Sequence, residues 1–210
     1  MIKNLTLLLL FALTLNSCTA QKKEEKQVRK SFENYKSAIL NDKGEEAVKF
    51  VDSRTIKYYS DILVKIKGAD SVEVNSLGLM DKIMVFSIRH RATPAEILSL
   101  DGKGLLVFAI KKGMVGKNSV ANNTIGDIEV DGTFAKGQFI FNGEKAPFYF
   151  HFYKEDEIWK IDLTSVFYIG TAAFRKMQED SGLDENEFLF SLLERLTGRK
   201  PGSEIWKKIE

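Results

Sequence analysis

The sequence predicts an α+β fold in which helices come first, a small antiparallel sheet follows, and further helices close the chain. Apolar residues recur at intervals of three and four over much of the first half, which is the spacing of helices packed by one face. Between Asn123 and Leu163 they instead alternate with polar residues and are separated by short turn sequences. This change of period indicates an antiparallel meander placed between two helical regions.

Three helices are expected before residue 70. The first apolar stripe comprises Val28, Phe32, Tyr35 and Ile39, and it ends at the polar turn sequence 41–44. A short helix through Phe50 follows. The third stripe comprises Ile56, Tyr59, Leu63 and Ile66, and Gly68 is its expected end.

A helical block is expected to follow, starting with a helix over 77–90. Its apolar side would contain Met80, Ile83, Met84 and Ser87. The cationic sequence 89–91 lies at its end, where positive charge complements the helix dipole. An anion site is the alternative interpretation of these residues, and the dipole interpretation is preferred.

Two more helix starts are encoded locally. Thr93 can cap a helix, Pro94 suits its first turn and Glu96 can complete a capping box. Asp101 is expected to begin one more helix, which Gly113 would end.

Four strands are expected over about 123–163. Asp131-Gly132 and Asn142-Gly143 are strong hairpin sequences. Between the second hairpin sequence and Leu163, apolar residues alternate with polar ones. One apolar sheet face would be formed by Phe148, Phe150, Phe152, Trp159 and Ile161. Two helices then close the chain, and Asp184 with Glu187 forms a capping box for the second.

Helices followed by this meander resemble the nuclear transport factor 2-like superfamily. The resemblance covers 32–51 and 146–163, treats 77–116 as a helical insert, and does not cover the helices after Ser165. It implies a cone-shaped α+β fold in which a curved sheet wraps helices. The superfamily includes ketosteroid isomerases, dehydratases and many proteins that only bind, so the resemblance alone assigns no activity.

The N-terminus indicates export and a lipid anchor. Lys3 and an uncharged apolar stretch over 5–15 precede the sequence Leu15-Asn16-Ser17-Cys18. These four residues resemble the lipobox of bacterial lipoprotein precursors, which implies removal of 1–17 as a signal peptide and lipidation of Cys18. An ordinary secretory signal is the alternative interpretation. The expected location is the outer membrane, facing the periplasm.

The remaining chain divides into a tether and one domain. Residues 18–27 are polar and charged after the cysteine, which predicts a flexible, solvated tether. Residues 28–210 are long enough for a single α+β domain with its own core. The expected contact with the membrane is through the lipidated N-terminus alone.

Composition excludes several classes of function. The chain carries 31 basic and 29 acidic residues, and this near-neutral balance argues against nucleic acid as a partner. One cysteine and two histidines provide no spacing typical of a metal site. No cofactor motif is present, so no cofactor and no metal are expected.

A polar cluster is the candidate site for chemistry. Tyr149, His151, Tyr153 and Asp162 would share the sheet face opposite the phenylalanines. A two-residue turn at Glu155-Asp156 pairs His151 with Lys160, whereas a four-residue loop pairs it with Asp162 and creates a possible acid/base pair. The sequence leaves both registers open. A solvated cross-strand cluster without catalysis is the preferred interpretation.

The sequence therefore favours a membrane-anchored envelope lipoprotein that binds a small apolar ligand or another envelope protein and is not an enzyme. The aromatic residues over 139–159 favour the apolar ligand. The alternatives are a protein-interaction or toxin-immunity lipoprotein, and an isomerase- or dehydratase-like enzyme that uses His151 or Asp162 for proton transfer.

Overall fold

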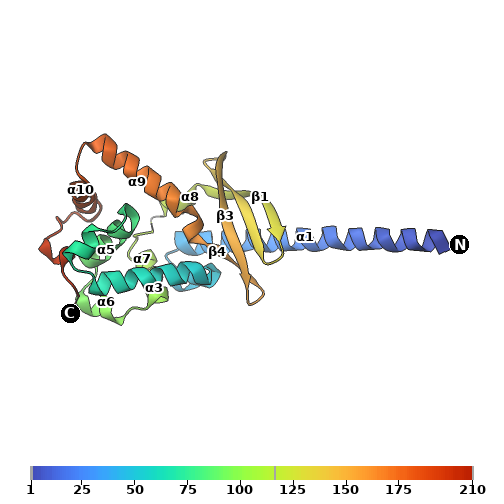
Figure 1. Ribbon diagram of the computed structural model, residues 1–210, viewed down its shortest axis with the longest axis horizontal. Helices are drawn as coiled ribbons and strands as arrows, with labels where there is room; N and C mark the ends of the chain where they lie inside the picture. The colour runs from blue at the N-terminus through green and yellow to red at the C-terminus, as the bar shows by residue number, and fades with distance from the viewer. Residues whose placement is uncertain (1, 116, 210) are drawn as a thin grey trace.

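In the computed structural model, a four-stranded antiparallel sheet packs against a long N-terminal helix, and the other helices gather at the end of the molecule away from the N-terminus (Figure 1). The structure describes the backbone of residues 2–115 and 117–209, and the side chains of 20–115, 117 and 120–209. This arrangement confirms the predicted α+β class and the order of its helical and sheet regions.

The three predicted N-terminal helices are present. The long helix α1 (Ile2–Leu40) ends where the polar turn was expected, and α2 (Gly44–Ala47) with the 3₁₀ turn η1 (Val48–Phe50) follows it. Next comes α3 (Ser53–Gly68), which ends at the predicted glycine. Asp52 caps α3 by accepting a hydrogen bond from the Thr55 backbone N–H at 2.9 Å, which fixes the helix start.

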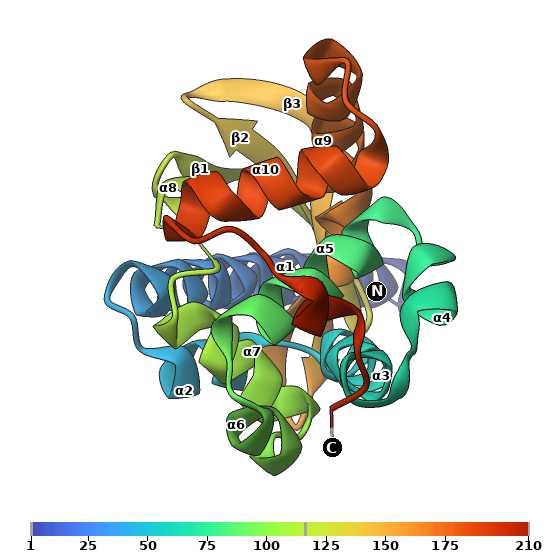
Figure 2. The same ribbon diagram turned by 90° about the vertical axis from the view of Figure 1, so that its left-hand side faces the viewer.

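Between α3 and the sheet, the described residues form α4 (Ser71–Asn75), α5 (Leu79–Arg91), α6 (Pro94–Ser99), α7 (Gly102–Lys111) and α8 (Asn118–Ala121), of which α5 to α7 lie in the predicted helical block. The capping box of Thr93 and Glu96 and the cap at Asp101 are confirmed. The predicted apolar side of α5 was wrong except at Ile83, because Met80, Met84 and Ser87 are only half-buried. The buried residues lie around the rest of the helix and include charged and polar ones: Lys82, Val85, Phe86, Ile88, Arg89 and His90. Helix α5 is enclosed since it contacts α3, α6, α9 and α10 (Figure 2).

The cationic end of α5 also serves a neighbouring helix. The buried Arg89 guanidinium donates to the carbonyls of Ile66 and Ala69 at 2.8 and 2.7 Å, at the C-terminal end of α3. It also donates to the Ile205 carbonyl at 3.1 Å, in the 3₁₀ turn η3 (Ser203–Trp206). Arg89 therefore satisfies free carbonyls of α3 and joins the end of the chain to it.

The sheet is the predicted meander of β1 (Asn123–Asp131), β2 (Phe134–Phe141), β3 (Glu144–Glu155) and β4 (Ile158–Asp162), in that order. Its first two turns lie at the predicted hairpin sequences, and Gly132 and Gly143 have φ of 57° and 83°. A Cβ at Gly137 would lie 2.2 Å from the Ile125 side chain, so any larger residue at this position in β2 would displace Ile125.

One sheet face is apolar and buried, as predicted. Phe152, Trp159 and Ile161 are at most 1% exposed, and α1 lies against this face. The rings of Phe32 on α1 and Phe150 on β3 have centroids 5.1 Å apart. The Ser31 hydroxyl on α1 donates to the Trp159 carbonyl on β4, which adds a polar contact to this apolar interface.

The chain closes with the 3₁₀ turn η2 (Leu163–Val166), α9 (Phe167–Ser181) and α10 (Glu185–Thr197). The predicted capping box of Asp184 and Glu187 is present at the start of α10. Gly198 ends α10 in the left-handed conformation with φ of 69°, a common helix end.

The expected flexible tether over 18–27 is instead part of α1. Its Gln, Lys and Glu residues favour a helix, and Glu24 has a partner in the sheet. The Trp159 indole N–H donates to the Glu24 carboxylate at 2.7 Å, and Lys154 pairs with it at 3.1 Å. The side chain of Cys18 lies outside the part that the structure describes. Among the helices described, none is long and apolar enough to span a bilayer.

Candidate functional site

A cavity of about 410 Å³ lies between the apolar sheet face and the helices. Three layers contribute to it: α1 supplies Phe32 and Tyr35, α3 supplies Tyr59, and the sheet supplies Phe139, Phe150 and Ile161. Phe32 and Tyr35 share one helix face because they are three residues apart. The predicted stripes of α1 and α3 therefore form cavity walls as well as solid core.

Aromatic rings and methionines form much of the cavity wall. The Phe150 ring lies 5.0 Å from that of Phe139, edge to face, and these two rings line the sheet side. Met80 and Met114 lie on the helical side. Methionine side chains are flexible and adapt to irregular shapes, so this side can adjust to an occupant.

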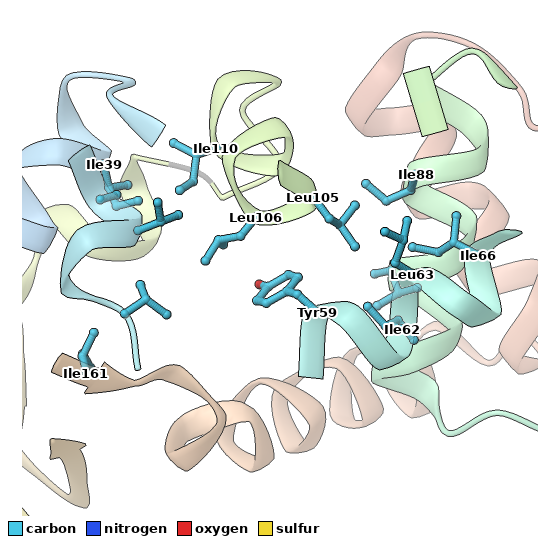
Figure 3. Close-up of a cluster of buried hydrophobic side chains, with 14 of the residues drawn as sticks. Ile39, Tyr59, Ile62, Leu63, Ile66, Ile88, Leu105, Leu106, Ile110 and Ile161 are labelled. Atoms are coloured by element: carbon cyan, nitrogen blue, oxygen red, sulfur yellow. The ribbon is translucent and has the colours of Figure 1, made fainter. Parts of the chain in front are cut away.

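Two tyrosines place hydroxyl groups in this apolar environment. Tyr35 and Tyr59 are 6% and 5% exposed, and both line the cavity. Figure 3 shows the Tyr59 ring projecting from α3 into the space between Leu106 and Ile161. Burial raises the pKa of Tyr59 to about 12, and burial together with the nearby Tyr59 raises the pKa of Tyr35 further. Both hydroxyls therefore keep their protons at neutral pH.

Lys36 is the one charged residue among the described residues of the cavity wall. Its ammonium donates to the Asn123 carbonyl at 2.7 Å, which joins α1 to the start of β1. This hydrogen bond holds the Lys36 ammonium next to the Asn123 backbone carbonyl at the cavity wall.

The structure selects one of the two strand registers that the sequence left open. His151 pairs with Asp162 across β3 and β4. The turn is not the four-residue loop expected for this register; it is a two-residue turn at Asp156 and Glu157, whose φ angles are 50° and 62°. The turn thus lies one residue later than Glu155-Asp156, which shifts the pairing by two residues.

His151 and Asp162 are neighbours in register but have separate partners. The His151 ring packs edge-on against Phe134 with centroids 5.3 Å apart. Asp162 is 6% exposed and accepts a hydrogen bond from the Thr164 backbone N–H at 2.9 Å. Within the described residues no hydrogen bond joins the imidazole to the carboxylate, and neither residue lines the cavity.

The two tyrosines of the predicted polar cluster also have structural contacts. The Lys136 ammonium lies 5.1 Å from the centroid of the Tyr149 ring, and the Arg54 guanidinium lies 3.4 Å from that of Tyr153. Arg54 also pairs with the fully buried Asp52 at 3.2 Å. The cluster of Tyr149, His151, Tyr153 and Asp162 thus lies on the face opposite the cavity, as alternation predicted. The expectation that this cluster is solvated is wrong for Asp162, which is buried.

Sequence reasoning missed the role of three residues. Tyr35 and Tyr59 were assigned to helix stripes, and no sequence pattern separates a cavity wall from a packed core. Asp52 could have been found, because Asp is a preferred N-cap residue and the apolar helical stripe begins one turn later, at Ile56. Among the described residues there is also no cluster of three or more side chains suited to hold a metal ion.

Comparisons of the chain with family models, with curated proteins and with solved structures found no match in any of the three. The resemblances to lipoprotein precursors and to nuclear transport factor 2-like proteins therefore stay predictions.

Proposed function

We propose that this protein is an exported, lipid-anchored protein that binds a small apolar ligand in the cavity between its sheet and its helices. One observation carries the proposal: the cavity of about 410 Å³ is lined almost entirely by aromatic and aliphatic side chains. Binding sites for small molecules commonly enclose ~300–1,000 Å³ and have mostly apolar walls with few polar groups.

The distribution of titratable groups supports binding rather than proton transfer. General acid/base catalysis needs a titratable group within hydrogen-bond reach of the substrate. His151 and Asp162 lie on the other sheet face, and the hydroxyls in the cavity have raised pKa values. Lys36, the one charged residue among the described wall residues, donates to the Asn123 carbonyl. A ligand here would be held by burial of its apolar surface.

A pair of valine substitutions tests ligand binding. Val166 lines the cavity and is half-buried, so Val166→Trp should fill part of the space and weaken binding of an apolar fluorescent probe at least tenfold. Val64 on α3 is 70% exposed, and Val64→Trp is the matched control. Equal binding by the two variants and the parent, measured by probe titration, would contradict the proposal.

Protein binding is a second candidate function, favoured by α9. This helix of 15 residues contains no fully buried residue, and Tyr168 and Met177 on it are 55% and 47% exposed. A photo-reactive residue at position 177 should then cross-link one stoichiometric envelope protein, and a residue at position 64 should not. Identical cross-linking patterns from the two positions would remove this candidate.

A further inference from the structure

Tyr35 and Tyr59 have hydroxyls without hydrogen-bond partners, although both side chains are almost fully buried. Buried tyrosine hydroxyls normally have a partner. Tyr58, next to Tyr59 in the chain, follows this rule: its hydroxyl donates to the Asp81 carboxylate at 2.8 Å. Within the described chain, no residue accepts from or donates to the other two hydroxyls. Their polar groups are therefore available to something that the chain itself does not supply.

Both hydroxyls open onto the cavity. Both side chains line the cavity. Some polar atoms of the described structure are fully buried and have no partner, but the two tyrosine oxygens are not among them. Both oxygens are therefore accessible from the cavity. Tyr59 contributes to the raised pKa of Tyr35, so the two phenols lie close enough to interact electrostatically. They reach this region from different helices, α1 and α3, and form a pair of hydroxyl donors in a mainly apolar wall.

We infer that the cavity selects an uncharged, mainly hydrocarbon molecule that carries one acceptor oxygen, a ketone, ester or alcohol, and that the hydroxyls of Tyr35 and Tyr59 donate hydrogen bonds to this oxygen. The inference rests on the proposed function and specifies the class of ligand. A protonated phenol is a good donor, and an apolar wall strengthens a hydrogen bond made within it. The rest of the molecule would lie against the rings of Phe32 and Phe150.

The cost of desolvation argues against a fatty-acid carboxylate. An ionised carboxylate in an apolar cavity needs a cation or several donors to replace its hydration. Lys36 is the one cation among the described wall residues; it is half-buried, and its ammonium donates to the neutral Asn123 carbonyl. A neutral oxygen needs only the two hydroxyls and has no charge to desolvate. The lower cost of desolvation favours a ketone over a carboxylate of the same length.

The test compares three probes of equal chain length: undecane, 2-undecanone and undecanoate. The full chain is placed in lipid nanodiscs, with empty nanodiscs as the blank, and affinities come from displacement of an apolar dye. The parent should bind 2-undecanone about tenfold tighter than undecane, and the double variant Tyr35→Phe/Tyr59→Phe should lose this preference while binding undecane equally well. Tyr58→Phe is the matched control and should keep the preference.

An infrared measurement reports the hydrogen bond itself. With 2-undecanone labelled at the carbonyl carbon, the C=O stretch should move to lower frequency in the parent and return toward its alkane-solution value in the double variant. Equal affinity of the parent for the ketone and undecane, a preference that survives in the double variant, or tighter binding of undecanoate would overturn the inference while leaving cavity binding intact. Failure of all three probes to bind the parent would instead overturn the proposed function and the inference together.

Discussion

At the scale of single residues, the cavity hydroxyls should be a cost to the empty protein. A buried hydroxyl without a partner has lost its hydration and gained nothing in return, whereas Phe has the same shape without the polar group. We expect Tyr59→Phe to leave the unfolding free energy unchanged or to raise it by up to about 1 kcal/mol. Tyr58→Phe should lower it by about 1 kcal/mol, because the Asp81 carboxylate then loses a donor. Urea unfolding of ligand-free protein measures both, and a destabilised Tyr59→Phe would contradict the argument.

His90 makes folding sensitive to acid. It is 2% exposed, and its Nε2 lies 3.0 Å from the Thr197 hydroxyl oxygen. Its Nδ1 is buried and has no hydrogen-bond partner within the described residues. Burial first, and then the charge of Arg199, lower the pKa of His90 below its ordinary value of 6.5, with Arg91 acting in the same direction and Glu204 opposing it. Below pH 6.5 the unfolded chain binds a proton that the native state resists. Stability should therefore be full above this pH and decrease as the pH falls below it.

The pH dependence can be separated from other acid effects. His90→Gln removes the titrating group, so the loss of unfolding free energy between pH 7.5 and pH 5 should be smaller in this variant than in the parent. Urea unfolding at a series of pH values provides the comparison. An unchanged slope in the variant would show that other groups cause the acid sensitivity.

At the scale of elements, the turn between β3 and β4 is the weakest of the three hairpin turns in sequence. Asp156 and Glu157 have positive φ without a glycine, whereas the other two turns contain Gly132 and Gly143. Glu157→Gly should relieve the left-handed strain at φ 62° and stabilise the protein by about 0.5–1 kcal/mol. Gly143→Ala, at φ 83°, should destabilise it by a similar amount. Thermal unfolding of both variants is the measurement, and shifts in the same direction would contradict the turn assignment.

The elements were predictable where their cause is local. The cap at Asp101, the box of Thr93 and Glu96 and the glycine hairpins each depend on a few adjacent residues, and all were confirmed. The β3–β4 register was not predictable, because neither candidate turn contained glycine. Contacts between distant parts of the chain were also hidden, including Arg89 at the end of α3. Residues that line a cavity follow the same apolar spacing as residues of a packed core. No sequence pattern therefore showed that Tyr35 and Tyr59 line a cavity.

At the scale of the whole molecule, one continuous cluster of buried apolar residues joins α1, the sheet, the helical block and α10. The lipid anchor that we propose would attach to the N-terminal side of this body. Cys18→Ala should therefore move the protein from the membrane fraction to a soluble or unprocessed form. Thr19→Ala is the control, because it changes the neighbouring residue and keeps the thiol. Retention of Cys18→Ala in the membrane fraction like the parent would contradict lipidation.

Residues 18–27 are helical, and the hydrogen bond between Trp159 and Glu24 fixes this segment to the sheet. A lipid anchor at Cys18 would therefore restrict the orientation of the whole molecule. Glu24 lies six positions after Cys18, which is about 9 Å along a helix at ~1.5 Å per residue. A stalk this short and stiff would hold the protein upright, with its sheet end next to the bilayer and its helical end pointing away (Figure 1). Lys22 and Lys23 would then stand among the lipid headgroups, where anionic lipids attract them. The anchored molecule would keep one orientation relative to the membrane surface.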